Sequence, residues 1–156
     1  MKIVLIQVGS TVDKYLKIGI AEYTSRLKHY AKFETIEIKD VKNAGKLSRD
    51  ELKKKEAVEI LKRIELGDSL VLLDERGTKM SSEKFASYIQ SKMNQSTKRL
   101  IFVIGGAFGF DEQVYDRSNG KISLSDMTFS HRMIRLLFTE QLYRAHTILR
   151  GEPYHH

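Results

Sequence analysis

The sequence predicts an α/β fold, in which a mostly parallel sheet has helices on both faces. Two observations support this prediction. Short runs that are apolar throughout recur along the chain, as expected for parallel strands buried on both faces. Segments with apolar residues at helical spacing separate these runs, so that strands and helices alternate. The apolar runs are residues 2–8 (KIVLIQV), 69–73 (SLVLL), 100–104 (LIFVI) and a shorter run just before Ser123.

Local patterns predict the remaining elements. Residues 33–39 (FETIEIK) alternate apolar and polar side chains, which predicts a strand with one solvated face. Ser48 followed by Glu51 is a capping-box pattern, and it predicts a helix that continues to about Glu65. Further helices are predicted over residues 13–28, from Ser81 or Ser82 to about Met93, and over residues 131–150.

The composition limits the class of protein. With 156 residues, 41% of them hydrophobic, the chain is predicted to form one domain, residues 1–156. It contains no apolar run of about 18 residues, and its short apolar start lacks a cleavage-site pattern. Neither a membrane span nor a signal peptide is therefore expected. The absence of cysteine excludes disulfides, thiolate nucleophiles and sulfur-ligated zinc, which fits a cytoplasmic protein.

The net charge of +7 is unevenly distributed. Residues 1–66 carry 15 basic and 10 acidic groups (+5), residues 67–130 carry 8 of each, and residues 131–156 carry 4 and 2 (+2). Contacts of Lys and Arg with phosphate supply sequence-independent affinity, so the excess is compatible with a nucleic acid partner. A basic surface that only keeps the protein soluble is the alternative.

Three loops are expected at the carboxyl ends of the strands, where parallel sheets bind ligands. They are residues 74–82 (DERGTKMSS), residues 105–110 (GGAFGF) and the stretch after Leu124. The glycines of the second loop would let a backbone approach a ligand closely. Ala107 breaks the GxGxxG pattern and no GK[ST] motif occurs, so a simple tight turn is the alternative.

The last predicted helix has two apolar faces. One face is broad and is expected to cover the sheet, whereas Met133, Leu136 and Tyr143 lie near the opposite side. A second apolar face needs a second partner, so we expect the same helix of another copy and hence a homodimer. The broad face consists of Ile134, Leu137, Phe138, Leu142, Ala145, Ile148 and Leu149.

A polar stripe runs between these two faces. Guanidinium groups on one stripe suit phosphate, so Arg132 and Arg135 are candidate contacts for RNA phosphates. A solvated helix face is the alternative. The stripe comprises Arg132, Arg135, Thr139, His146 and Arg150. Gly151 and Pro153 then end the helix, and the terminal histidines are either functional, frayed or a tag remnant.

Four segments together resemble the ribosomal RNA large subunit methyltransferase H family of the SPOUT class. They are IGGAFGF (104–110), SLSDMTFSHRMIR (123–135), EQLYRA (140–145) and the final RGEPYHH, and the resemblance covers the whole chain. It implies S-adenosylmethionine as methyl donor, a homodimer and a carboxyl-terminal trefoil knot. It also implies methyl transfer to N3 of a pseudouridine in the helix-69 loop of 23S rRNA, in assembled 70S ribosomes.

The resemblance further implies which residues form the site. Substrate-side positions match His131, Arg144, Tyr154 and His155. A proline often stands in the family where this chain has Ser130, so this loop is expected to be slightly less preorganised. The cofactor-contacting positions match Leu73, Gly105, Gly106, Leu124, Ser125, Asp126, Met127, Thr128 and Phe129.

A sulfonium donor is already activated, so the enzyme mainly has to align methyl and nitrogen and help the N3 proton leave, without a metal. His131, His155, Asp126 and water are the alternatives for the base. The rival function is a noncatalytic, RNA-associated assembly protein with the same fold. A third alternative is a nucleotide-binding enzyme of another kind, but the GxGxxG and GK[ST] motifs of such enzymes are absent from this sequence.

Overall fold

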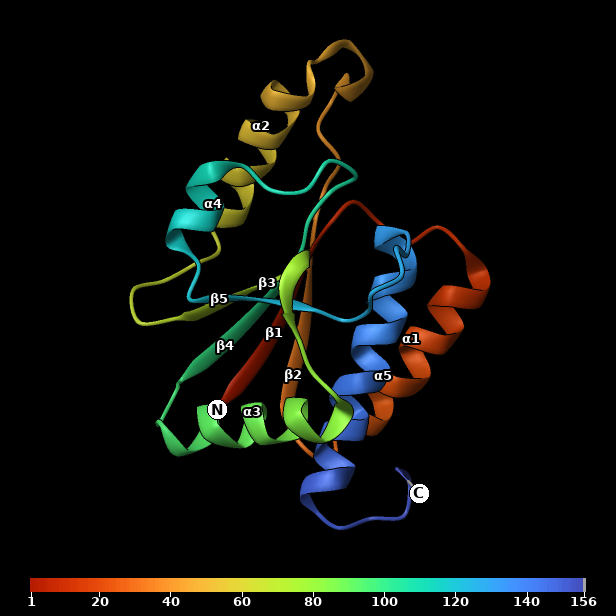
Figure 1. The fold of residues 1–156 in the computed structure, drawn as a ribbon. Coiled ribbons are helices and arrows are strands. Elements are labelled where there is room, and N and C mark those ends of the chain that lie inside the picture. Colours follow the sequence, from red (N-terminus) through yellow and green to blue (C-terminus); the bar gives the residue numbers. More distant parts are fainter. Residues whose placement is uncertain (156) are drawn as a thin grey trace.

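A computed structural model describes residues 1–155. His156, whose origin as a native residue or tag remnant the sequence leaves open, lies outside the described residues. Five strands form one sheet in the order β2-β1-β4-β3-β5, and every neighbouring pair is parallel (Figure 1). The predicted parallel sheet is therefore confirmed. Its strands are β1 (Lys2–Val8), β2 (Lys32–Ile38), β3 (Ser69–Lys79), β4 (Arg99–Ile104) and β5 (Gly120–Ser123).

Helices cover both faces of this sheet, as predicted. Because successive side chains of a strand point to opposite faces, Ile3 and Leu5 of β1 enter one apolar cluster and Val4 and Ile6 enter another. The first cluster is covered by α1 (Lys14–Leu27), α3 (Ser82–Asn94) and α5 (His131–Leu149), and the second by α2 (Arg49–Leu61) and α4 (Glu112–Arg117).

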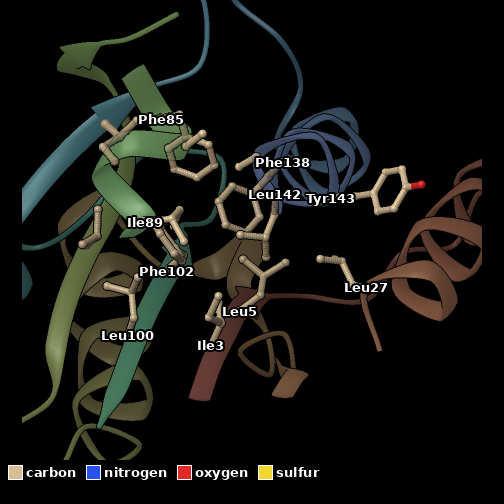
Figure 2. Close-up of a cluster of buried hydrophobic side chains, with 14 of the residues drawn as sticks. Ile3, Leu5, Leu27, Phe85, Ile89, Leu100, Phe102, Phe138, Leu142 and Tyr143 are labelled. Carbon is tan, nitrogen blue, oxygen red and sulfur yellow. The ribbon is translucent and has the colours of Figure 1, made fainter. Parts of the chain in front are cut away.

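Aromatic rings join α3 and α5 to the sheet (Figure 2). The Phe102 ring of β4 lies 4.7 Å from the Phe138 ring of α5 and 6.1 Å from the Phe85 ring of α3, measured between centroids. Phe102 and Phe138 are completely buried. Aromatic pairs of this geometry add about 0.5–1.5 kcal/mol beyond the burial of their surface. This contact fixes the position of α5, which reaches the loops at the carboxyl ends of the strands.

The second apolar face of α5 packs in part against α1 of the same chain. A Cβ atom added to Gly19 of α1 would lie 2.9 Å from the Leu136 side chain, so the two helices are in close contact there. Tyr143 is 9% exposed and packs against the rings of Tyr23 and Tyr30. Helix α1 therefore accounts for part of this face, while Met133 and Leu136 are only partly buried. The homodimer implied by the family stays a prediction.

Two local expectations are corrected. Residues 74–79, predicted as loop, belong to the long strand β3, whose pairing with β5 shifts register between Leu73 and Thr78. Helix α4 and a short 3₁₀ helix, η1 (Ala44–Lys46), were not predicted, because neither has an apolar periodicity that is long enough.

The capping box at Ser48 is confirmed, since its hydroxyl accepts from the Glu51 N–H and the Glu51 carboxylate accepts from the Ser48 N–H.

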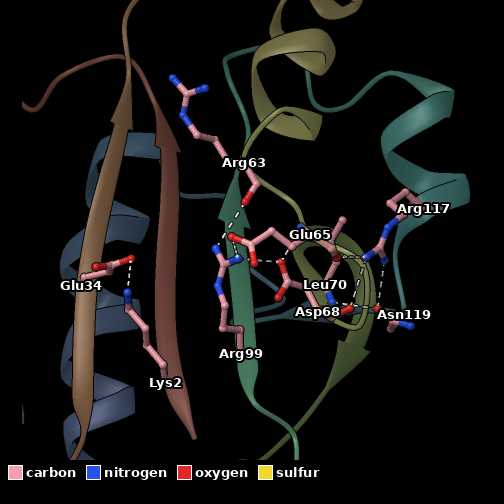
Figure 3. Close-up of polar contacts among 9 residues, drawn as sticks. All are labelled: Lys2, Glu34, Arg63, Glu65, Asp68, Leu70, Arg99, Arg117 and Asn119. Carbon is pink, nitrogen blue, oxygen red and sulfur yellow. Dashed lines mark hydrogen bonds and ion pairs between the residues drawn. The ribbon is translucent and has the colours of Figure 1, made fainter.

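Polar contacts fasten the loop before β3 to its neighbours (Figure 3). Arg99 at the start of β4 forms ion pairs with Glu65 at 2.5 Å and with Asp68 at 3.2 Å. Arg117 donates to the backbone carbonyls of the same two acidic residues, and the Asn119 side chain accepts from the Leu70 N–H at 2.7 Å. These contacts hold the amino ends of β3, β4 and β5 together. They lie at the opposite edge of the sheet from the carboxyl ends, where parallel sheets bind ligands.

Candidate functional site

A cavity of about 680 Å³ lies at the carboxyl ends of β3, β4 and β5. Its walls come from residues 73–76 of β3, the glycine loop after β4, the loop after β5 and the first turns of α2 and α5. A volume of this size is ordinary for a small-molecule site. All three segments expected to bind a ligand contribute to it, including residues 74–76, which are part of β3.

Most residues predicted to hold the cofactor meet in this cavity. Asp126 is the exception, because its side chain is 76% exposed and forms an ion pair with Lys79 instead. The lining residues from that prediction are Leu73, Gly105, Gly106, Leu124, Ser125, Met127, Thr128 and Phe129.

Two glycines let the loop after β4 fold tightly against its surroundings. A Cβ atom on Gly105 would lie 3.1 Å from the Phe110 ring, and one on Gly106 would lie 2.6 Å from a carboxylate oxygen of Glu56. The Gly109 N–H donates to the Gly106 carbonyl, and Gly109 has a φ of +77°, which favours glycine. The loop is thus a tight turn and a cavity wall at once.

The loop after β5 is shaped by serine side chains. The Ser125 hydroxyl accepts from the Met127 N–H at 2.9 Å, and the Ser123 hydroxyl donates to the Ser125 carbonyl at 2.9 Å. The Ser130 hydroxyl then accepts from the Met133 N–H at 3.2 Å and caps α5. Proline has no side-chain oxygen to make this cap, so Ser130 contributes order to the loop in a different way.

The cavity contains charges of both signs. Asp50, Asp74 and Glu75 supply carboxylates, while cationic side chains stand beside them. Asp74 is held in place, because its carboxylate accepts from the Tyr115 hydroxyl and from the Arg76 N–H at 2.8 Å. Burial, followed by the contact with Asp74, raises the pKa of Tyr115. The cationic lining residues are Arg49, Lys53 and Arg76.

His131 also lines the cavity, at the start of α5. Burial lowers its pKa, and the positive charges of Arg135 and Arg132 lower it further, while Asp40 opposes them. Its imidazole is therefore neutral at pH 7 and has an unprotonated nitrogen. A neutral imidazole at the wall of a cavity can accept a proton.

Glu56 lies beneath the glycine loop as a buried acid. It is 8% exposed, and burial together with the negative charge of Asp40 raises its pKa to about 7. Its closeness to Gly106 was not predicted, because the two residues lie on different elements.

The other three predicted substrate-side residues lie away from this cavity, near the carboxyl end of α5. Arg144 lies 13 positions after His131, which corresponds to about 20 Å along a helix. Arg144 lies 4.7 Å from the centroid of the Tyr154 ring, and its Nη1 is 3.5 Å from Nδ1 of His155. Arg144, Tyr154 and His155 therefore form one cluster, and His131 is not part of it.

Two acidic residues that were not predicted organise this cluster. Glu140 accepts from Arg144 and from the Tyr154 hydroxyl, at 2.6 and 3.1 Å. Glu83 contacts Nε2 of His155 at 2.8 Å. His155 is thus held between Arg144, on the side of its Nδ1, and Glu83, on the side of its Nε2. The spacing of four between Glu140 and Arg144 was a usable signal, whereas nothing local points to Glu83.

The two arginines proposed for RNA phosphates have different surroundings. Arg132 is partly exposed and lies 3.5 Å from Asp13. Arg135 is completely buried, and its guanidinium donates to the Thr11 hydroxyl at 2.8 Å and to the Val8 carbonyl at 2.5 Å. The prediction for Arg135 is therefore wrong, because the projection of a helix does not show which neighbours cover it.

Within residues 1–155, no group of three or more metal-ligating side chains is close enough to hold a metal ion. Across the same part of the chain, no helix is long and apolar enough to span a bilayer.

Comparison with known proteins identifies the family. Residues 1–155 match the family described as "Predicted SPOUT methyltransferase". A protein of Cytophaga hutchinsonii named ribosomal RNA large subunit methyltransferase H is 55% identical over 156 residues, which cover both chains fully. The chain belongs to the ribosomal RNA large subunit methyltransferase H family of SPOUT methyltransferases.

Other members of this methyltransferase family are equally similar along their length. Proteins of the same name from Christiangramia forsetii and Parabacteroides distasonis are 54% and 53% identical over 156 residues, covering all of this chain and 99% of theirs. The family resemblance found in the motifs is thereby confirmed.

Proposed function

We propose that this protein transfers a methyl group from S-adenosylmethionine to N3 of a pseudouridine in the helix-69 loop of 23S rRNA, in assembled 70S ribosomes. The observation that carries the proposal is the cavity, which eight of the nine predicted cofactor residues line. The curated relatives are named as methyltransferases of large-subunit ribosomal RNA. The proposal also includes a cytoplasmic homodimer of single SPOUT domains, residues 1–156.

The residues of the cavity fit S-adenosylmethionine. Its adenosine needs a neutral wall that a backbone can approach closely, which the glycine loop and the uncharged residues after β5 provide. Its amino acid part and sulfonium carry both signs of charge, and the cavity contains carboxylates and cations. When bound, the donor supplies an electrophilic methyl group.

The chain itself has to orient the base and accept the N3 proton. His131 stands at the cavity wall in its neutral form, so it is the proposed proton acceptor. Arg144, Tyr154 and His155 are proposed to hold the nucleotide, since a guanidinium suits phosphate and aromatic rings stack on bases.

A second copy of the chain would bring the cluster of Arg144, Tyr154 and His155 close to a cavity with His131 in its wall. Within one chain, Arg144 lies about 20 Å along α5 from His131, which is too far for one base to contact both. In the proposed homodimer, the cluster of one copy would complete the cavity of the other.

Transfer of radiolabelled methyl groups tests the function. We expect label in 23S rRNA when 70S particles are the substrate, and less label with free 50S subunits or naked rRNA. Calorimetry should show binding of S-adenosylmethionine. A noncatalytic assembly protein, the rival, would bind the ribosome and transfer nothing.

Complementation tests the shared site. We expect a Gly106→Ala variant and an Arg144→Ala variant each to be inactive alone and to recover part of the activity when mixed, because a mixed dimer contains one intact composite site. Mixtures that stay inactive while their subunits exchange would contradict this arrangement.

A further inference from the structure

A strongly basic segment adjoins the cavity, and apart from Arg49 and Lys53, which line the cavity, its cations have no part in the function proposed so far. Residues 39–55 contain seven Lys or Arg and three Asp or Glu, a net +4 of the +7 of the whole chain. The segment comprises the loop after β2, η1 and the beginning of α2. In Figure 1 it projects beyond the carboxyl ends of the strands, at the top of the molecule.

Most of its cations have no anionic partner. Lys42, Lys46, Lys54 and Lys55 are exposed. Among the ion pairs of residues 1–155, none joins these four side chains to a carboxylate. They are therefore available to an external anion.

Two of the three acidic residues of the segment have local partners. Asp50 lies 3.3 Å from Lys53, and the Glu51 carboxylate accepts from the Ser48 N–H at 2.8 Å as part of the capping box. This hydrogen bond lowers the pKa of Glu51. Asp50 and Glu51 thus serve local structure, and the segment keeps its net positive charge.

The segment is continuous with the wall of the cavity. Arg49 and Lys53 line that wall. The Arg49 guanidinium lies 4.9 Å from the centroid of the Phe108 ring, which is 46% exposed on the glycine loop. A polyanion lying on these lysines would consequently pass beside the cavity.

We propose that this basic surface binds the phosphate backbone of the RNA substrate and aligns the target loop with the cavity. The surface consists of Lys42, Lys46, Arg49, Lys53, Lys54 and Lys55. The inference rests on the proposed function, because it takes RNA as the substrate. Lysines on long stems act as point charges, which suits a backbone without sequence readout. The surface supplies the contacts that the buried Arg135 cannot make.

A triple variant tests the surface. Lys42→Gln, Lys46→Gln and Lys54→Gln remove three exposed charges that do not line the cavity. We expect at least tenfold weaker binding to ribosomal particles. The slope of log affinity against log salt concentration should decrease by about 2, since each phosphate contact contributes roughly 0.7–0.9. The affinity for S-adenosylmethionine, measured by calorimetry, should stay within about twofold.

A matched control removes the same charge at the opposite edge. Lys28, Lys32 and Lys98 are exposed near the amino ends of β2 and β4, and their triple Gln variant should bind ribosomal particles like the wild type. Equal binding by the two triple variants, whether both weak or both unchanged, would overturn the inference. A wild-type protein that binds ribosomes without methylating them would instead contradict the proposed function and leave the binding comparison valid.

Discussion

Glu140 joins Arg144 to Tyr154. One carboxylate oxygen of Glu140 accepts from Nη2 of Arg144 at 2.6 Å and from the Tyr154 hydroxyl at 3.1 Å. The hydrogen bond to Glu140 raises the pKa of Arg144, and the side chain of Glu140 is only 16% exposed. A single carboxylate therefore fixes two of the side chains proposed to hold the nucleotide.

Replacing this carboxylate should impair catalysis more than folding. For Glu140→Gln we expect at least a tenfold decrease in kcat/KM for ribosomes, because small displacements of positioning groups reduce rates strongly. Binding of S-adenosylmethionine should not change. Glu22 pairs with Arg26 at the same spacing of four on α1, so Glu22→Gln is the matched control and should keep wild-type activity. Wild-type activity of Glu140→Gln would exclude the positioning role.

Substitutions of Arg135 and Arg132 should affect different properties, the first the stability of the fold and the second the binding of RNA. Arg135→Met removes a buried guanidinium and leaves the Val8 carbonyl without its donor, so the free energy of unfolding should decrease by about 2–4 kcal/mol. Arg132→Gln should change it by less than about 1 kcal/mol, since its ion pair is partly exposed. Only Arg132→Gln should lower the salt dependence of ribosome binding. Urea denaturation and binding titrations at several salt concentrations measure both effects.

Gly106→Ala should damage the cavity. The new Cβ atom would lie 2.6 Å from the Glu56 carboxylate, so either the Glu56 side chain or the loop after β4 has to shift. We expect at least tenfold weaker binding of S-adenosylmethionine by calorimetry. Gly120→Ala is the control, because nothing lies within 4 Å of its added Cβ atom. An unchanged donor affinity in Gly106→Ala would show that this loop does not contact the donor.

His131 should determine the acid limb of the pH profile. Its pKa is lowered, chiefly by burial, so it is unprotonated at pH 7 and gains a proton only below its usual value of about 6.5. The single-turnover rate should therefore decrease as the pH falls below about 6.5. His131→Asn should be slower at pH 7 and lack this limb, with donor binding little changed. Equal rates for the variant and the wild type would remove His131 from the mechanism.

His146 should make stability depend on pH. It is 5% exposed, its Nε2 has no hydrogen-bond partner, and burial lowers its pKa to about 4. The unfolded chain, with an imidazole pKa of about 6.5, binds this proton more readily. The contribution of His146 is complete above pH 6.5 and is lost as the pH falls toward 4, by roughly 3 kcal/mol.

Comparing variants isolates this contribution. His146→Phe should lose less stability than the wild type between pH 7 and pH 4, as measured by urea denaturation. His29→Phe, at an exposed position, should follow the wild type. If His146→Phe and the wild type respond equally to pH, another group carries the dependence.

Some features follow from local sequence. The apolar runs predicted buried strands because each strand has a helix layer on both sides, and Val4 and Leu5 indeed enter opposite clusters. The capping box of Ser48 and Glu51 acts over three residues, so its pattern is complete within the sequence. The family motifs likewise identified the loops that surround the cavity, since those loops are contiguous segments.

Other features depend on which elements meet. A helix projection gave the correct angles for Arg135 and Tyr143, but only the packing of α5 against its neighbours decided that both are buried. Glu56 lies against Gly106 and Glu83 contacts His155. Both contacts join segments that are far apart in the sequence, so no local spacing could predict them. The sequence by itself determined most of the elements, the charge and the family. The tertiary structure decided which polar groups became part of the interior and which remained at a site, because burial depends on neighbours far away in the chain.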